Sequence, residues 1–111
     1  MTHRAIVLAI LTLAAQQAQA QPPGLEALKA SNAYIDCMMR AARKLDDGHS
    51  GVAGVGRSVQ NACLDAQHRW ENAQSVNFPE ARKRAFLEEV KTQSAMVAVN
   101  IVLEERRFRR N

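Results

Sequence analysis

Two cysteines are the residues of this chain with the most readily interpreted chemistry. Cys37 and Cys63 lie far apart in the sequence. Redox enzymes instead place their thiols in a C-x-x-C arrangement at a helix start, which lowers the pKa of one thiol. Because residues 1–20 indicate export to an oxidising compartment, the two cysteines are predicted to form a disulfide, and their spacing indicates a structural one. Oxidised cysteines leave no thiolate for zinc, so no structural metal site is expected.

The other side chains with catalytic chemistry are not spaced as an active site. Ser58, Asp65 and His68 are the residue types of a triad, but on one helix Ser58 and Asp65 lie about 10.5 Å apart along the axis. His49 is expected to be solvated in a turn. We predict no catalytic residue, no cofactor and no metal ion, and therefore a protein that is not an enzyme.

Two further patterns superficially suggest chemistry. Adjacent acids such as Asp46 and Asp47 can do acid–base work, but here they are expected to be solvated and to end a helix. The stretch 51–56 (GVAGVG) resembles a phosphate-binding loop. It lacks the G-K-[ST] ending and the G-x-G-x-x-G order, and it follows a helix instead of a strand. A flexible helix entry is the preferred interpretation.

The C-terminal region is the segment for which a binding function is predicted. Residues 96–103 (MVAVNIVL) are apolar nearly all round, which exceeds the single stripe that a core helix requires. A basic segment follows them, and it could simply be a solvated tail whose charges suit the helix dipole. The alternative is an interaction surface for a second copy of the chain or for an anionic envelope component. Its candidate residues are Met96, Val99, Leu103, Arg106, Arg107, Phe108, Arg109 and Arg110.

Residues 1–20 have the organisation of a secretory signal peptide. Arg4 provides the basic start, an apolar run extends from Ala5 to Ala15, and small residues stand at Ala18 and Ala20. The apolar run is too short to cross a bilayer, which needs about 20 residues. We expect cleavage after Ala20, a periplasmic or secreted protein, and no transmembrane segment after cleavage.

The remaining residues suffice for one small domain. Residues 21–24 are predicted to be an extended lead-in, because their two prolines resist helix, and residues 25–111 a single helical domain. The chain has a formal net charge of +4 with acids and bases interspersed. This balance does not indicate nucleic acid as a partner, and an anionic envelope component suits an exported protein better.

Apolar spacing predicts an all-α fold, an antiparallel bundle of three helices at about 25–46, 52–75 and 80–109. Each pattern places apolar residues three, four or seven positions apart, on one helix face. Gly48 suits the left-handed residue that closes a helix, and Pro79 suits the first turn of the third helix. The apolar faces are Leu28, Ile35, Met38, Ala42 and Leu45; Val52, Val55, Val59, Ala62, Cys63, Ala66, Trp70 and Ala73; and Phe86, Val90, Val97, Ile101 and Phe108.

The sequence positions of the two cysteines agree with an antiparallel bundle. In an antiparallel hairpin that turns near residue 50, Cys37 and Cys63 lie equally far from the turn and face each other, as a disulfide requires. The same alignment places Tyr34 near Ala66, and a second turn near residue 77 places Trp70 close to Phe86. It also predicts that the third helix extends beyond its partner from about residue 104.

The stretch 37–48 (CMMRAARKLDDG), followed by a helix that carries Ala62 and Cys63, resembles small uncharacterised exported helical proteins of proteobacteria. The resemblance covers about residues 30–65. It implies a secreted helical hairpin and carries over no activity, ligand or catalytic residue.

Three functions follow as hypotheses. The preferred one is a non-enzymatic interaction or structural protein of the envelope, self-associating through the third helix. The second is a periplasmic stress holdase, a small chaperone whose disulfide-linked helices survive unfolding conditions. The third is peripheral binding of anionic lipid or polymer through the basic C-terminus, which salt would weaken.

Overall fold

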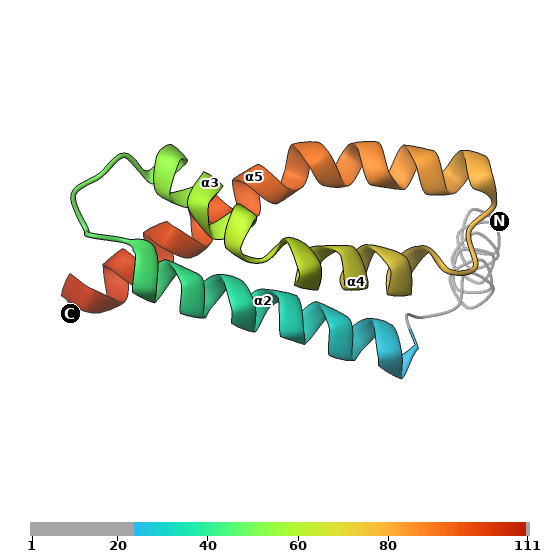
Figure 1. Cartoon of the computed structure of the whole chain (residues 1–111), viewed down its shortest axis with the longest axis horizontal. Coiled ribbons are helices and arrows are strands. Elements are labelled where there is room, and N and C mark those ends of the chain that lie inside the picture. The colour runs from blue at the N-terminus through green and yellow to red at the C-terminus, as the bar shows by residue number, and fades with distance from the viewer. Residues whose placement is uncertain (1–23, 111) are drawn as a thin grey trace, which may run out of the picture.

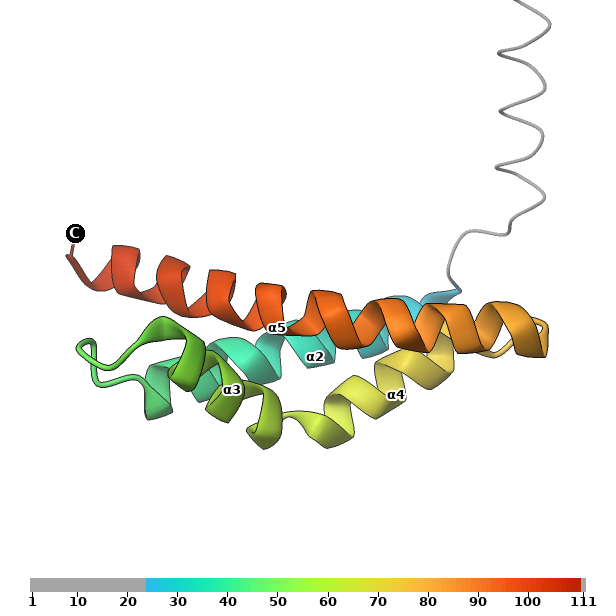
Figure 2. The same ribbon diagram turned by 90° about the horizontal axis from the view of Figure 1, so that it is seen from above.

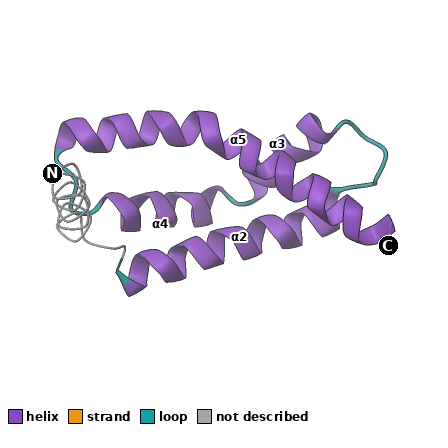
Figure 3. Ribbon diagram, turned by 180° about the vertical axis from the view of Figure 1, so that it is seen from behind, coloured by secondary structure: helices purple, strands orange, loops and turns teal. Residues whose placement is uncertain are grey.

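The computed structural model describes residues 24–110, and every regular element in that range is a helix (Figures 1 and 3). The four helices are α2 (Leu25–Leu45), α3 (Val52–Ala62), α4 (Leu64–Ser75) and α5 (Glu80–Arg110). The prediction of an all-α fold is therefore confirmed for this part of the chain. The predicted signal peptide and most of the predicted lead-in lie outside the described residues.

The helix α2 matches the first predicted helix within one residue. It ends at Leu45, and the backbone N–H of the next residue, Asp46, donates to the Ala42 carbonyl (3.0 Å). The backbone of Asp46 itself is extended. Gly48 has a φ of 82°, so the left-handed conformation predicted for it is confirmed. A residue with a Cβ would be strained there, which explains why glycine stands in the turn between α2 and α3.

The prediction of three helices is wrong, because the second predicted helix is two helices that meet at Cys63. The Cys63 N–H donates to the Gln60 carbonyl, three residues back, and Gln67 N–H then donates to the Cys63 carbonyl to start α4. Figure 2 shows that α3 and α4 meet at an angle. The bend allows α3 to pack mainly against α5 and α4 mainly against α2.

The third predicted helix is confirmed as α5, which runs the length of the described structure (Figure 1). The Pro79 carbonyl accepts a hydrogen bond from Lys83 N–H (2.9 Å) in its first turn. Proline costs little at a helix start because the N–H that it lacks would have no intrahelical acceptor. No helix within residues 24–110 is both long enough and apolar enough to cross a membrane.

The predicted disulfide is present between Cys37 of α2 and Cys63, with 6.0 Å between the two Cα atoms. Cys63 is 1% exposed and belongs to the core. The cross-link joins α2 to the junction of α3 and α4, so it holds the hairpin at the point where the second predicted helix bends.

The buried core is formed by side chains of α2, α3 and α5 together with Cys63, and α4 adds the partly buried Ala66 and Trp70. Its most buried members are Met38, Ala42, Val59, Ala98 and Val102, each 0% exposed. The predicted faces were only partly correct. Leu28, Ile35 and Leu45 of α2 were expected to be apolar contacts and are exposed, because the buried stripe of α2 runs through Ala27 and Tyr34 instead. Phe108, expected on the apolar face of the third helix, is also exposed.

Aromatic side chains continue the core between α2, α4 and α5. The Trp70 ring lies 5.7 Å from the Tyr34 ring and 5.7 Å from the Phe86 ring, between centroids. The predicted proximity of Trp70 and Phe86 is therefore confirmed. The Tyr34 hydroxyl donates to Gln67 Oε1 (3.3 Å), and its burial raises the pKa of the phenol.

Candidate functional site

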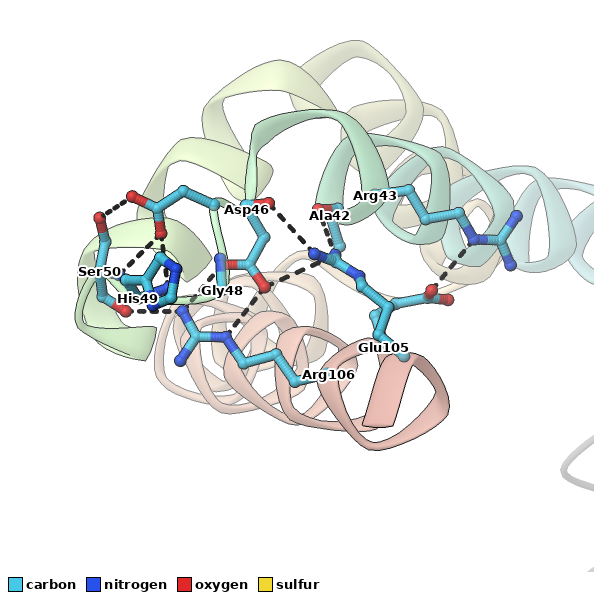
Figure 4. Close-up of polar contacts among 10 residues, drawn as sticks. Ala42, Arg43, Asp46, Gly48, His49, Ser50, Glu105 and Arg106 are labelled. Atoms are coloured by element: carbon cyan, nitrogen blue, oxygen red, sulfur yellow. Dashed lines mark hydrogen bonds and ion pairs between the residues drawn. The ribbon is translucent and has the colours of Figure 1, made fainter. Parts of the chain in front are cut away.

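The densest polar cluster in the described structure is centred on the carboxylate of Asp46, just after α2. Arg106 of α5 donates to it through two nitrogens, Nε to Oδ2 (2.9 Å) and Nη2 to Oδ1 (2.8 Å). Arg109 Nη2 lies 3.5 Å from Oδ2. The Asp46 side chain is 0% exposed and that of Arg106 is 14% exposed. Figure 4 shows Asp46 and Arg106 facing each other across the end of the bundle.

The same arginines also donate to backbone carbonyls in the last turn of α2 and in the turn that follows it. Arg109 donates to the carbonyls of Asp46 (3.2 Å) and Ala42 (3.4 Å), and Arg106 donates to that of Ser50 (2.6 Å). Positive charge at a helix C-terminus is favoured by the helix dipole. The two arginines therefore fix the last turn of α5 to the end of α2 and the turn that follows it.

The charge state of Asp46 is set by this environment. The hydrogen bonds from Arg106 hold the pKa of the Asp46 carboxyl below its usual range, although burial acts in the opposite direction. The pKa of Arg106 is raised by the same bond. A carboxylate that stays ionised and bound to guanidinium is suited to structural support and not to proton transfer.

A second ion pair lies beside the first. Glu105 Oε2 accepts from Arg43 Nε (3.1 Å), and the Glu105 side chain is 10% exposed. Glu105 and Arg106 are consecutive on α5, so two adjacent residues bind opposite charges on and just after α2 (Figure 4). The final turns of α5 are thus fixed by ionic contacts, with Val102 as the last fully buried apolar residue before them.

Two predictions about this region are wrong. The third helix was expected to have no partner from about Glu104 onward, but its end contacts the end of α2, because α5 crosses from α3 to α2 near its C-terminus. Asp46 was expected to be solvated and is buried. Its neighbour Asp47 is exposed and accepts hydrogen bonds from Ser50 and from His49 N–H within the turn, which lowers the pKa of the Asp47 carboxyl.

The eight predicted interaction residues separate into three groups. Arg106 and Arg109 are engaged in the Asp46 cluster, and Val99 is half-buried. The remaining residues are exposed, with Met96, Leu103 and Phe108 at 62%, 45% and 76%. The exposed members are Met96, Leu103, Arg107, Phe108 and Arg110.

Met96 and Leu103 lie on the side of α5 that faces away from the core. Seven residues make almost two full helical turns, so the two side chains share one face. Ala98 and Val102 on the opposite side are fully buried. We call the face that carries Met96 and Leu103 the outward face of α5.

Val99 borders the outward face and packs against α3. A Cβ on Gly56 would lie 3.1 Å from Val99 Cγ2, which is closer than most side-chain contacts. Gly56 is thus needed for close packing of α3 on α5. The glycine-rich stretch forms the first turns of α3, in agreement with its prediction as a helix entry.

The residues weighed as a triad are exposed and belong to two helices. Ser58 lies on α3 and donates to the Gly54 carbonyl (3.3 Å), while Asp65 and His68 lie on α4. Within residues 24–110, no group of three or more metal-binding side chains is close enough to hold an ion. Comparison with known proteins finds no matching family model, curated protein or solved structure.

Proposed function

We propose that this protein is a non-catalytic, exported component of the cell envelope that acts by self-association through the outward face of α5. The exposure of Met96 and Leu103 on one face of a long, well-packed helix carries the proposal. Exposed apolar side chains that gather on one face mark interaction sites more often than isolated ones do.

A second copy is the occupant that fits this face best. On this face, Glu89 lies on the N-terminal side of the apolar centre and Arg110 lies on its C-terminal side. Both charges are available on one copy, so the surface complements itself. A helix of 31 residues is about 46 Å long, and one helix face is a small interface, which favours a weak and reversible dimer.

An anionic lipid or polymer is a poorer match for the same region. Arg106 and Arg109 were expected to supply half of the basic charge, but both are bound to Asp46 and to nearby carbonyls. Arg107 is exposed at 75% and lies 3.5 Å from Glu104, which offsets part of its charge. The net positive potential of the C-terminus is therefore smaller than the sequence suggests.

Export is supported by two observations. Residues 1–20 combine a basic start, an apolar run and small residues before the expected cleavage point. The cysteine pair forms a disulfide, and such bonds persist in oxidising compartments. The proposal predicts that protein purified from the periplasm or the medium has the mass of residues 21–111, lower by two hydrogens until it is reduced. A mass that retains residues 1–20 contradicts export.

Self-association is tested by one substitution and its matched control. Leu103→Glu places a charge on the outward face, and Leu64→Glu places one on α4, where the leucine is 43% exposed, close to the 45% of Leu103. Size-exclusion chromatography with light scattering should show a mass that rises with concentration for the unaltered chain and for Leu64→Glu. Leu103→Glu should stay monomeric at all concentrations. Equal behaviour of the two variants contradicts the proposal.

A further inference from the structure

Four exposed residues of α5 follow one another at seven-residue spacing and form a column along one face of the helix. In chain order they are Glu89, Met96, Leu103 and Arg110, and all four are exposed. Arg82 continues the same spacing toward the start of α5, where its guanidinium lies over the Phe78 ring at 4.1 Å. Side chains seven positions apart stay on one face, since seven residues make almost two turns. From Glu89 onward, the column therefore has an acid, two apolar residues and then a base.

This order is self-complementary in one orientation only. Glu89 and Arg110 lie equally far from the midpoint between Met96 and Leu103, at about 16 Å along the helix axis. If two copies lie antiparallel about that midpoint, each acid faces a base and each methionine faces a leucine. If they lie parallel, Glu89 faces Glu89 and Arg110 faces Arg110, and like charges oppose the pairing.

We infer that two copies of this chain pair through antiparallel α5 helices, related by a two-fold axis midway between Met96 and Leu103. Met96 then packs against the partner's Leu103, and Glu89 pairs with the partner's Arg110. The inference rests on the proposed function and adds the orientation and alignment of the two copies. An isologous two-fold contact of this kind closes on itself and gives a dimer instead of a filament.

The Asp46 cluster has a role in this arrangement, because it holds the end of the helix that carries Arg110. Without tertiary contacts, the last turn of a helix frays. Arg109 donates to the carbonyls of Asp46 and Ala42, so the turn next to Arg110 is fixed to α2. A base held in place loses less conformational freedom on binding than a mobile one.

The existing contacts of the column leave it free to pair. Glu89 accepts a hydrogen bond from Gln93 Nε2 (3.1 Å) that is exposed to solvent. Solvent-exposed bonds of this kind contribute little and exchange readily for others. Thr92 and Asn100, also on this side of α5, are exposed and polar, as expected for residues that flank a small apolar centre.

Orientation is tested with two single cysteines introduced into the full mature chain. Asn100→Cys lies next to the proposed axis, so the new thiols of two copies meet. Thr92→Cys lies on the same side of α5. In the antiparallel arrangement, however, its thiols in the two copies are separated by about 22 Å along the helix axis. The native cysteines are joined to each other and Cys63 is 1% exposed, so mild oxidation should cross-link only the new thiols.

The outcomes separate this inference from the proposed function. Cross-linking of Asn100→Cys and not of Thr92→Cys supports the antiparallel dimer. Cross-linking of both, in a chain that sediments as a dimer, overturns the orientation and leaves self-association through α5 intact. A dimer in which neither variant cross-links overturns the use of this face. A chain that sediments as a monomer at every concentration overturns both.

A charge exchange provides a second, independent readout. Glu89→Arg and Arg110→Glu should each weaken the dimer about tenfold, because each replaces two attractive pairs by two repulsive ones. An equal mixture of the two variants should restore the affinity of the unaltered chain, since every facing pair is again opposite in sign. A mixture that stays as weak as either variant alone overturns the pairing of Glu89 with the partner's Arg110.

Discussion

Replacing Asp46 by asparagine tests whether the ion-pair cluster holds the end of the bundle. Asparagine keeps the size of the side chain and one acceptor oxygen, but it removes the charge and turns one oxygen that binds Arg106 into a donor. A hydrogen bond to a charged group contributes about 1.5–3 kcal/mol. Because the cluster lies at the end of the bundle, near solvent, we expect Asp46→Asn to cost about 2 kcal/mol.

The assay is thermal unfolding of the two proteins followed by circular dichroism at several pH values. For a domain of this size, 2 kcal/mol corresponds to a decrease in Tm of about 10 °C at pH 7. The Asp46 carboxyl has a lowered pKa in the folded state. Its contribution is therefore fully present above the unfolded pKa of about 3.9 and is lost as the pH falls through the folded value. The difference between the two proteins should shrink below about pH 4.

Asp36→Asn is the matched control, because Asp36 is an exposed carboxylate on the same helix, α2. It should change Tm by no more than about 2 °C, as exposed substitutions usually have small effects. Equal melting temperatures for Asp46→Asn and the unaltered chain at pH 7 would refute the structural role of the cluster. A difference that persists undiminished at pH 2 would refute its electrostatic origin.

The disulfide and the close packing of α3 on α5 can be tested by substitution. Replacing Cys37 and Cys63 by serine should lower the free energy of unfolding by about 3–4 kcal/mol on the chain-entropy model, as measured by urea titration; an unchanged midpoint would contradict this. Gly56→Leu should cost about 1–3 kcal/mol, because its Cβ meets Val99. Gly54→Ala has open space around the new Cβ and should stabilise the helix by up to about 1 kcal/mol. Effects of the same sign in both glycine variants would argue against close contact at Gly56.

The disulfide and the helical hairpin could be predicted from sequence because both follow from local rules. Glycine and proline mark the turns near Gly48 and Pro79, and apolar spacing between them indicates helices. With those turns placed, the positions of Cys37 and Cys63 fix how the first hairpin aligns. The pairing of Trp70 with Phe86 follows from the same reasoning about the second turn.

The bend at Cys63 could not be predicted in this way. No glycine or proline stands there, and the residues on either side favour helix. The bend depends on tertiary contacts, since α3 must reach α5 while α4 stays against α2. Contacts of this kind override local preference without leaving a signal in the sequence.

The Asp46 cluster was missed for a related reason. Asp46 and Arg106 are 60 residues apart, and charged residues at a helix end and in a C-terminal segment are usually solvated. Only the crossing of α5 over the end of α2 brings them together. The same crossing explains why the arginines of the C-terminus separate into bound and exposed ones, a distinction that composition does not reveal.

Sedimentation equilibrium of the unaltered chain of residues 21–111 is the most direct test of the proposed self-association. Samples should span a concentration range from below one micromolar to several hundred micromolar, because a small interface predicts a dissociation constant in roughly the micromolar range. We expect a mass that rises from one copy to two and then levels off. A mass of one copy at every concentration would contradict it.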